Sequence, residues 1–300
     1  MNESISLIID RIQKSCIEIS KLLHDEDLYK LSSLSDKINK SGDDMKKLDQ
    51  QANNILKKNL IDLSCIKAIA SEEEINIIYT DNYNGEYLIS FDPLDGSQNI
   101  GTNITTGTIF GIFKWDNTSK ITSGRSIVCA GYCVYGAATQ FVLAYEKKVS
   151  LYQYISKEKS FILQRDNIII PKSGKFYSIN EANNKKWLLL KIRNFINKIR
   201  EKKNNRWVGC MVADIHRTLL QGGCFLYPSD IKNTEGKLRL FYEAYPMAFI
   251  FETAKGTAIT DYKASNNNVN ILDVLFPIKI HQKIPVIFLG SEELKLYNNS

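Results

Sequence analysis

The sequence lacks any window of about 18 uninterrupted apolar residues, so it contains no candidate for a membrane-spanning helix. Its start, MNESISLIID, mixes charged and polar residues with apolar ones and does not resemble a secretory signal peptide. None of the six cysteines forms a CxxC pair, and most lie in apolar segments, which favours reduced core residues. We therefore expect a protein of the cytoplasm, with an organelle after loss of a transit peptide as the alternative.

A strong charge of one sign, an internal repeat and a low-complexity segment are also missing. The formal net charge is +6 over 300 residues, and the positive side chains are spread along the chain. This distribution argues only weakly for a polyanionic partner and suits a small phosphorylated ligand equally well, so we expect no nucleic acid as a partner. With 44% hydrophobic residues, the chain can form one large domain or two subdomains.

Periodic apolar residues predict the elements of the first half of the chain. Steps of three and four residues in 4–23 and 44–61 indicate two amphipathic helices. Asp43 can cap the second helix, and Asp49 lies further along it. Apolar runs and β patterns predict strands in 66–73, 86–93, 106–115, 130–146 and 150–155.

The composition changes near residue 171, where a basic amphipathic helix is predicted over 186–205. Its apolar stripe could contact a membrane surface, but a buried stripe under a solvated face is favoured. We place a boundary in 168–176 and expect two α/β subdomains, residues 1–170 and 171–300. The first would carry most of the acidic ligands and the second the sugar contacts.

Acidic residues follow several predicted strands and one helix. In an α/β sheet, ligand sites form at strand ends. Carboxylates that converge there repel one another unless cations neutralise them, and hard oxygen ligands select Mg²⁺ or Mn²⁺. The acids concerned are Asp43, Asp49, Glu72, Glu73, Asp92, Asp95 and Glu243.

The segment FDPLDGSQN, residues 91–99, has a plain interpretation as a surface turn, because Asp, Pro, Gly, Ser and Asn all favour turns. A second interpretation is chemical. Gly96, Ser97 and the residue after them can direct backbone N–H groups at an anion, while Asp92, the Leu94 carbonyl and Asp95 hold a metal ion beside it. Metal on one side of a phosphate and amides on the other make a phosphoryl-transfer site.

Beyond these patterns, the sequence resembles the class I fructose-1,6-bisphosphatases. The matching segments occur in family order from about residue 35 to about 292: ASEEE, FDPLDGSQN, GTIFGIF, RWVGCMVADIHRTLLQGGCFLYPSD, GKLRLFYEAYPMAF and ILDV. The resemblance implies a layered α/β sugar-phosphatase fold, a homotetramer, and a role in gluconeogenesis. It also implies hydrolysis of the 1-phosphate of fructose 1,6-bisphosphate with Mg²⁺, for which Mn²⁺ can substitute.

The same resemblance implies roles for particular residues. Metal ligands would be Glu72, Asp92, the Leu94 carbonyl, Asp95 and Glu243, with Asp43 near a further ion. Glu73 and Asp49 would activate the attacking water, and Asp95 would also belong to the catalytic group. Gly96 and Ser97 would hold the reacting phosphate, and Met211 would touch the sugar. The distal phosphate and the rest of the substrate would be bound by Asn180, Tyr227, Lys237, Arg239 and an Arg206 from a neighbouring subunit.

The chain departs from the family pattern at Gln98, in the turn expected to hold the reacting phosphate, and at Trp207 and Asn183, near the residues expected to hold the distal one. Trp207 replaces a tyrosine and offers an indole N–H in place of a hydroxyl. These changes prompt an alternative substrate, sedoheptulose 1,7-bisphosphate, although MVADIHRTL favours the fructose compound. A catalytically weak regulatory homologue is a further alternative, opposed by the complete set of acids.

The N-terminal region departs further. The family's Thr-Gly-Glu turn and its preceding helix, which bind the effector AMP, have no counterpart, and Glu86 replaces a family lysine, while Tyr87 and Arg125 match. We expect AMP to be a poor inhibitor. The alternative is that residues 15–20 or the DEDLYKL stretch rebuild the site.

Overall fold

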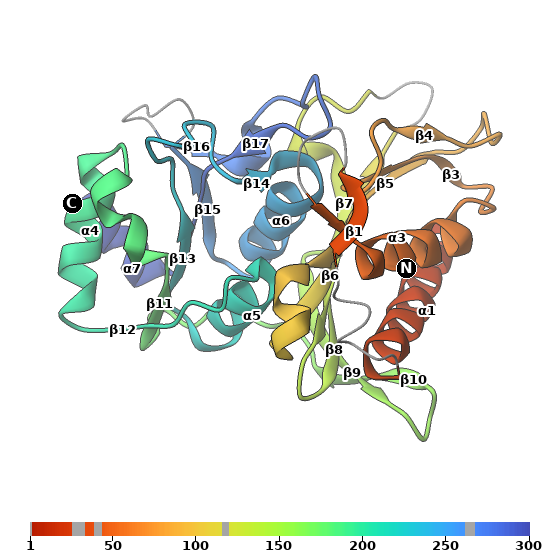
Figure 1. The fold of residues 1–300 in the computed structure, drawn as a ribbon, viewed down its shortest axis with the longest axis horizontal. Coiled ribbons are helices and arrows are strands. Elements are labelled where there is room, and N and C mark those ends of the chain that lie inside the picture. The colour runs from red at the N-terminus through yellow and green to blue at the C-terminus, as the bar shows by residue number, and fades with distance from the viewer. Residues whose placement is uncertain (1, 26–33, 39–43, 116–119, 262–267) are drawn as a thin grey trace.

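The computed structural model describes residues 2–25, 34–38, 44–115, 120–261 and 268–300. Helix and sheet layers alternate along the long axis of the molecule (Figure 1). Within the described residues the α-helices are α1 (Glu3–Asp25), α3 (Lys47–Leu60), α4 (Leu190–Arg200), α5 (Met211–Gln221), α6 (Tyr245–Thr253) and α7 (Ser291–Asn298). Shorter helical turns are η1 (Ser97–Thr102), η2 (Gly124–Ser126), η3 (Glu181–Lys186), the π-helical η4 (Leu240–Ala244) and η6 (Ile271–Asp273).

The larger sheet is antiparallel apart from one pair of strands. In spatial order its described strands are β10 (Ser160–Arg165), β9 (Lys148–Ile155), β8 (Thr139–Tyr145), β7 (Ile127–Tyr135), β6 (Thr106–Lys114), β5 (Tyr87–Asp95), β3 (Ile66–Ser71) and β4 (Ile78–Tyr79). Only β3 and β5 run parallel to each other in this part of the chain. Their carboxyl ends therefore lie next to one another at one edge of the sheet.

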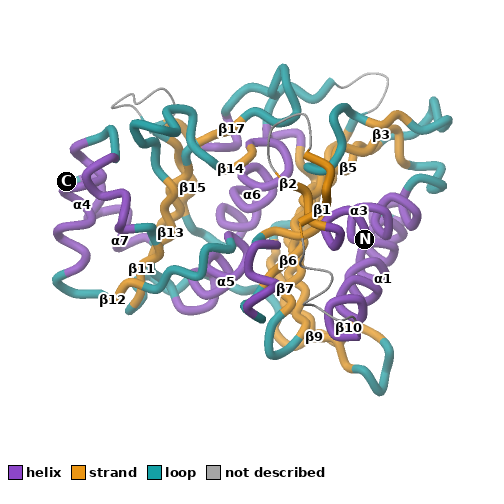
Figure 2. Tube along the Cα trace, in the orientation of Figure 1, coloured by secondary structure: helices purple, strands orange, loops and turns teal. Residues whose placement is uncertain are grey.

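The smaller sheet is mixed. Its described strands, in spatial order, are β12 (Asn204–Asn205), β11 (Phe176–Ser178), β13 (Cys224–Tyr227), β18 (Val286–Leu289), β15 (Thr257–Thr260) and β16 (Val269–Asn270). Two short ladders complete the strands: β1 (Leu34–Ile38) with β2 (Asp44–Lys46), and β14 (Leu238–Arg239) with β17 (Lys283–Ile284). Figure 2 shows the two sheets as separate strand layers with α5 and α6 between them.

Both sheets are covered on both faces, because side chains alternate from one apolar cluster to the next. Leu88 of β5 packs with α5 and α6, whereas its neighbour Ile89 packs with α1 and α3. In β18, Phe288 joins the central cluster and Ile287 joins the cluster beneath α4 and α7. This double burial explains why the strands are nearly continuous apolar runs in the sequence.

The predicted elements of the first half recur in the structure, with several changes of boundary. The helix predicted from residue 44 begins at Lys47, because Asp44–Lys46 pair with β1 instead. The predicted strand 130–146 is two strands, β7 and β8, joined by a turn at residues 136–138. The basic helix is limited to Leu190–Arg200, and residues 160–165 form a strand, β10, that the pattern did not predict.

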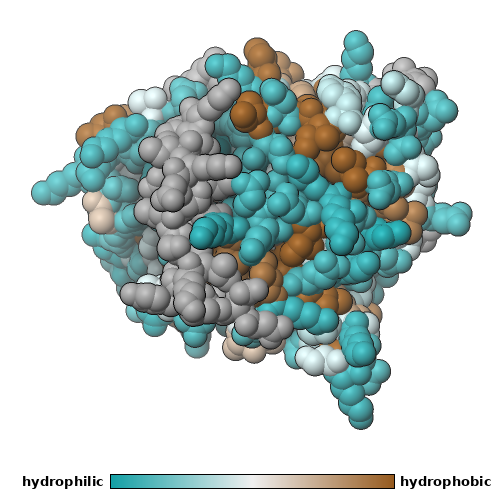
Figure 3. Space-filling model, turned by 45° about the vertical axis from the view of Figure 1, so that its right-hand side comes forward, coloured by the Kyte–Doolittle hydropathy of each residue, from teal (hydrophilic) through white to brown (hydrophobic). Residues whose placement is uncertain are grey.

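The basic helix buries its apolar stripe, as the sequence favoured. Ile192, Phe195, Ile196 and Ile199 are buried against the smaller sheet and α7. Among the described residues, no helix is long and apolar enough to cross a membrane. On the face drawn in Figure 3, hydrophilic side chains predominate and hydrophobic ones are scattered in small groups among them.

Candidate active site

The β5 strand carries Asp92 and Asp95 on the same side of the sheet, although their spacing of three would put them on opposite sides of a regular strand. The cause is a bulge: Asp92 pairs with Ile109 of β6 but Asp95 pairs with Gly107, so β5 has one residue more than its partner. The Leu94 N–H donates to Asp92 Oδ1 at 3.0 Å within this bulge. The turn-forming composition of FDPLDG thus belongs to a strand that is bent to present two carboxylates.

Glu243 reaches the same place from the π-helical η4, which runs directly into α6. Ser90 of β5 donates to the Phe241 carbonyl at 3.0 Å and fixes η4 against the strand. The Arg239 N–H donates to Glu243 Oε2 at 2.5 Å. As a result, ligand oxygens of Asp92, Asp95 and Glu243 all lie within 4.8 Å of one another.

This acidic cluster is electrostatically strained without a cation. Asp92 and Glu243 are only 4% and 5% exposed. Burial, followed by repulsion from Glu72 and the other acids, raises the pKa of both well above the usual range. The pKa of Asp95 is raised to about 6, chiefly by burial. Buried oxygen ligands whose charge is not compensated are the environment that a hard divalent ion requires, so the residues fit a metal of that kind.

Glu72 and Glu73 follow the last residue of β3, beside the parallel end of β5. Arg239 Nε lies 3.8 Å from Glu72 Oε1. Burial, then repulsion from Asp49 and Glu72, raises the pKa of Glu73 to about 8. Asp49, in the first turn of α3, is therefore close enough to act on Glu73 electrostatically. The structure brings all the described acids of the prediction together; Asp43 lies outside the described residues.

Asp95 is held by the start of α5, a contact that the sequence analysis did not predict. The Val212 N–H donates to Asp95 Oδ2 at 2.7 Å, and Cys210 Sγ lies 3.1 Å from the same oxygen. The next residue, Gly96, has φ +76°, and a Cβ there would lie 2.6 Å from Cys210 Cβ. A glycine is required at this position for both reasons, and Ser97 then begins η1.

A second unpredicted set of contacts holds the turn that contains Glu72 and Glu73. Asn53 accepts from Ser71 Oγ and donates to Glu74 Oε1, both at 2.8 Å. Lys57 forms an ion pair with the same Glu74 oxygen at 2.5 Å. Asp49, Asn53 and Lys57 are spaced by four residues and so share one face of α3. That polar stripe was the sequence signal that could have revealed them.

The residues expected at the distal phosphate lie in looser surroundings. Asn180 and Tyr227 line one small hollow, together with Asn183. Lys237 Nζ is 5.8 Å from the centre of the Tyr227 ring. The Asn180 side chain accepts from the Ala182 N–H at 3.2 Å and caps η3.

Arg206 and Trp207 border this distal group. The exposed Arg206 lies over the ring of Phe176, with 5.3 Å from its guanidinium carbon to the ring centre. Trp207 stacks on Phe225 at 5.9 Å and meets the Tyr227 ring edge-on at 5.5 Å. The tryptophan therefore acts as packing beneath Tyr227.

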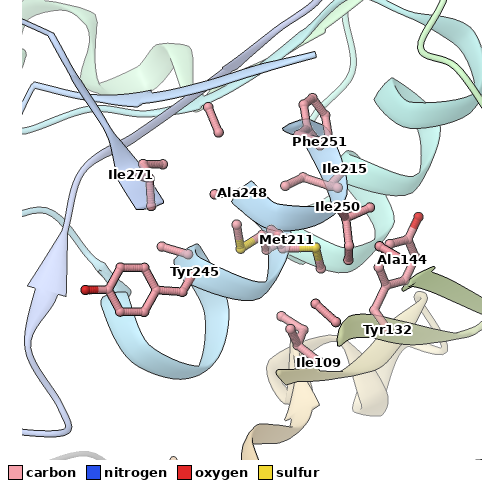
Figure 4. Close-up of a cluster of buried hydrophobic side chains, with 14 of the residues drawn as sticks. Ile109, Tyr132, Ala144, Met211, Ile215, Tyr245, Ala248, Ile250, Phe251 and Ile271 are labelled. Atoms are coloured by element: carbon pink, nitrogen blue, oxygen red, sulfur yellow. The ribbon is translucent and has the colours of Figure 1, made fainter. Parts of the chain in front are cut away.

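Two segments connect the acidic cluster with the distal group. Residues 206–212 lead from Arg206 to the N–H that holds Asp95, and residues 237–243 lead from Lys237 through Arg239 to Glu243. Met211 begins α5, and its buried side chain lies in the central cluster beside Ala248 and Ile250 (Figure 4).

Comparison with known proteins matches both halves of the chain to the same family. The family model described as "Fructose-1-6-bisphosphatase, N-terminal domain" matches residues 1–166, and the model described as "Fructose-1-6-bisphosphatase, C-terminal domain" matches residues 170–297. A class 1 fructose-1,6-bisphosphatase of Persephonella marina is 39% identical over 295 residues, which are 97% of this chain and 89% of that protein. A cytosolic fructose-1,6-bisphosphatase of Oryza sativa subsp. indica is 37% identical over 302 residues, 96% of this chain and 86% of that protein.

The solved structures agree. The crystal structure of Leishmania major fructose-1,6-bisphosphatase in holo form matches with a TM-score of 0.91 and 35% identity, covering 99% of this chain and 94% of that chain. Layers of helix and sheet around a buried acidic cluster thus define a phosphatase of the sugar-phosphatase fold. The chain belongs to the class I fructose-1,6-bisphosphatase family, whose enzymes act on a sugar bisphosphate and use a divalent metal.

Proposed function

We propose that this chain hydrolyses the 1-phosphate of fructose 1,6-bisphosphate to fructose 6-phosphate and phosphate, with Mg²⁺ as the natural metal and Mn²⁺ as a substitute. The observation that carries the proposal is the acidic cluster of Asp92, Asp95 and Glu243, whose oxygens lie within 4.8 Å of one another in a chain of this family. Glu72 and the Leu94 carbonyl complete the proposed ligand set. A bound ion of this kind polarises the phosphoryl group and neutralises the leaving oxygen.

Glu73 and Asp49 are proposed to take the proton from the attacking water. The pKa of Glu73, raised to about 8 by burial and by the neighbouring acids, marks it as a group that accepts a proton readily. Asp95 is fixed by the Val212 N–H. It would thereby hold the proposed metal ligands in place relative to Gly96 and Ser97, which are proposed to bind the reacting phosphate. In this proposal Glu73 and Asp49 transfer the proton, and the other acids bind the metal ion.

The substrate is proposed to lie between the two connecting segments. Backbone N–H groups at Gly96 and Ser97 would hold the reacting phosphate, and Met211 would contact the sugar near the start of α5. Arg239, beside Glu72, would bind the substrate at the metal end. The distal phosphate would be held by Asn180, Tyr227, Lys237 and Arg206 of a neighbouring subunit in a homotetramer.

Sedoheptulose 1,7-bisphosphate is the second candidate substrate, favoured by the packing of Trp207 beneath Tyr227. Steady-state kinetics on both bisphosphates at saturating Mg²⁺ decide between them. We expect kcat/KM for the fructose compound to be higher by about tenfold or more, since positioned polar contacts discriminate strongly. A higher value for sedoheptulose bisphosphate would reverse the assignment, and no turnover of either would favour a regulatory homologue.

Three further features are proposals of the same kind. We place the protein in the cytosol, the compartment of the similar cytosolic fructose-1,6-bisphosphatase of rice. We divide the chain into subdomains at residues 1–170 and 171–300. The homotetramer is supported by the exposed position of Arg206, which leaves its guanidinium available to another subunit.

A further inference from the structure

A network of polar side chains crosses the site from Arg239 to the backbone of Glu74. The Arg239 guanidinium interacts with the hydroxyl of the buried Tyr242. Tyr242 Oη lies 2.5 Å from His281 Nδ1. His281 Nε2 in turn lies 2.9 Å from the Glu74 carbonyl oxygen. Four residues from three separate segments are thus connected.

For a neutral His281 ring, the two ends of this network fix the direction of each hydrogen bond in it. A guanidinium can only donate and a carbonyl oxygen can only accept. The His281 Nε2–H therefore donates to Glu74, which leaves Nδ1 as an acceptor for the Tyr242 hydroxyl proton. Tyr242 then accepts from Arg239. Burial and the Arg239 charge lower the pKa of His281, which agrees with a neutral imidazole.

The network contacts the turn that carries Glu72 and Glu73 at both of its ends. At one end Arg239 pairs with Glu72, and at the other end the His281 ring holds the Glu74 carbonyl two residues later. Tyr242, in the middle, immediately precedes Glu243 in η4. A single network therefore relates the turn after β3 to the acid of η4.

We propose that Tyr242 and His281 are positioning residues, which hold the Glu72–Glu73 turn at a fixed distance from Glu243 and so set the affinity of the metal site. This inference rests on the proposed function, because it assigns a purpose to the network only if the acids bind a divalent ion. Hydrogen-bonded neighbours of metal ligands typically contribute 10- to 100-fold in affinity or activity.

The test is a titration of the protein with Mn²⁺ in the absence of substrate. Electron paramagnetic resonance measures the bound and free Mn²⁺ at each step. His281→Ala removes both hydrogen bonds and should weaken Mn²⁺ binding about 10- to 100-fold. His281→Gln keeps an N–H donor for the Glu74 carbonyl and should recover most of that loss. Tyr242→Phe keeps the ring and the His281–Glu74 bond but breaks the link to Arg239, so its affinity should lie between the two.

The chain offers a matched control in a second tyrosine and histidine pair. Tyr132 Oη lies 3.0 Å from His216 Nδ1, and His216 Nε2 lies 3.0 Å from Gln140 Oε1, so both ring nitrogens face neutral partners and not the acids of the site. His216→Ala should lower the melting temperature and leave Mn²⁺ affinity unchanged. Equal losses of affinity in His216→Ala and His281→Ala would reduce the effect to general destabilisation and overturn the proposal.

Two other results would also overturn it: His281→Ala binding Mn²⁺ like the unaltered protein, or His281→Gln binding as weakly as His281→Ala. If His281→Ala does not fold, the near-isosteric Tyr242→Phe decides, since unchanged Mn²⁺ affinity there rejects the network. These readouts need no turnover. Failure of the unaltered protein to hydrolyse the bisphosphate would contradict the proposed function. The Mn²⁺ affinities of the variants would still test the positioning role of Tyr242 and His281.

Discussion

The acidic end and the distal end of the site are built in different ways. Asp95, Glu243 and Glu74 each receive hydrogen bonds from backbone or side-chain donors of another segment or turn. Lys237 and Arg206 are exposed; each lies over an aromatic ring, and Arg206 also donates to the carbonyl of the adjacent Asn205. The acidic end is thus fixed by the fold, whereas the distal end consists of side chains free to adjust.

This difference follows from where charge is buried. Carboxylates that repel one another in the interior must be held by many bonds, because each would otherwise move toward solvent. A phosphate at the surface can be met by flexible cations that also contact water. Changes at the acidic end should therefore alter turnover, and changes at the distal end should alter substrate affinity.

The largest effect is expected for Glu73→Gln. Loss of a positioned base typically costs about 10²- to 10⁴-fold in rate, so kcat should fall by that factor while metal affinity is retained. Steady-state kinetics with Mn²⁺ titration measure both quantities, and Glu158→Gln, an exposed glutamate, serves as the control. A variant that loses metal but keeps its rate at saturating Mg²⁺ would show Glu73 to be a ligand only.

Asp92→Asn should combine lower activity with higher stability. Weaker charge stabilisation by the metal should reduce kcat at least about 100-fold, and Glu72→Gln should behave alike. In metal-free protein the same change removes a buried, repelled charge, so the free energy of unfolding should rise. Urea unfolding in EDTA measures it, with the exposed Asp62→Asn as control. Near-normal turnover at saturating Mg²⁺ would reject the ligand assignment.

The pH dependence of stability should reveal the same repulsion. Folding raises the pKa of Glu73 to about 8 and that of Asp95 to about 6, so between these values and the unfolded ones the folded state binds more protons. Stability of the metal-free protein should therefore fall as pH rises, by about 2 kcal/mol from pH 6 to 8. Urea titrations at both pH values test this. Added Mn²⁺ should flatten the trend, and a metal-free stability that rises with pH would contradict it.

The sequence predicted that these acids would lie close together because its signals are local. Glu72 and Glu73 follow β3, Asp92 and Asp95 lie at the end of β5, and the parallel pairing of β3 and β5 brings these strand ends together. The family resemblance then supplied roles that spacing alone did not. What the sequence could not predict was the bulge at Asp92, since a one-residue excess depends on the partner strand.

Contacts between distant segments were also beyond prediction. The Val212 N–H that holds Asp95 is 117 positions away, and the His281 ring that holds Glu74 is 207 positions away. No periodicity links such residues, because the pairing arises only when both sheets pack on α5 and α6. The polar stripe of α3 is the exception, since its four-residue spacing is visible in the sequence.

A smaller effect is expected at the distal end. Lys237→Ala should raise KM by about tenfold with little change in kcat, because a contact made equally in the ground and transition states affects binding alone. Lys232→Ala, an exposed lysine nearby, should leave both constants unchanged. A fall in kcat with constant KM would mean that the distal end contributes to the reaction itself, and the contrast between the two ends would be lost.

The smallest effect is expected from AMP, which should inhibit this enzyme poorly or not at all. Three positions that the family resemblance connects with the nucleotide are already occupied by other contacts. Glu86 forms an ion pair with Lys114 at 2.6 Å, Tyr87 is buried, and Arg125 binds Asp273 at 2.7 Å.

Residues 15–20, the alternative AMP site suggested by the sequence, also have side chains that are engaged in other hydrogen bonds. Ser15 donates to the Arg11 carbonyl at 2.8 Å, and Ser20 hydrogen-bonds Thr139 at 2.7 Å in the interior. Most of the DEDLYKL stretch lies outside the described residues. An effector shifts a tetramer only through unequal affinity for its two states, and Glu86 repels the phosphate on which that affinity would depend. Titration of AMP against activity at limiting Mg²⁺ tests this, with Glu86→Lys as the variant expected to gain sensitivity; cooperative inhibition of the unaltered protein at micromolar AMP would contradict it.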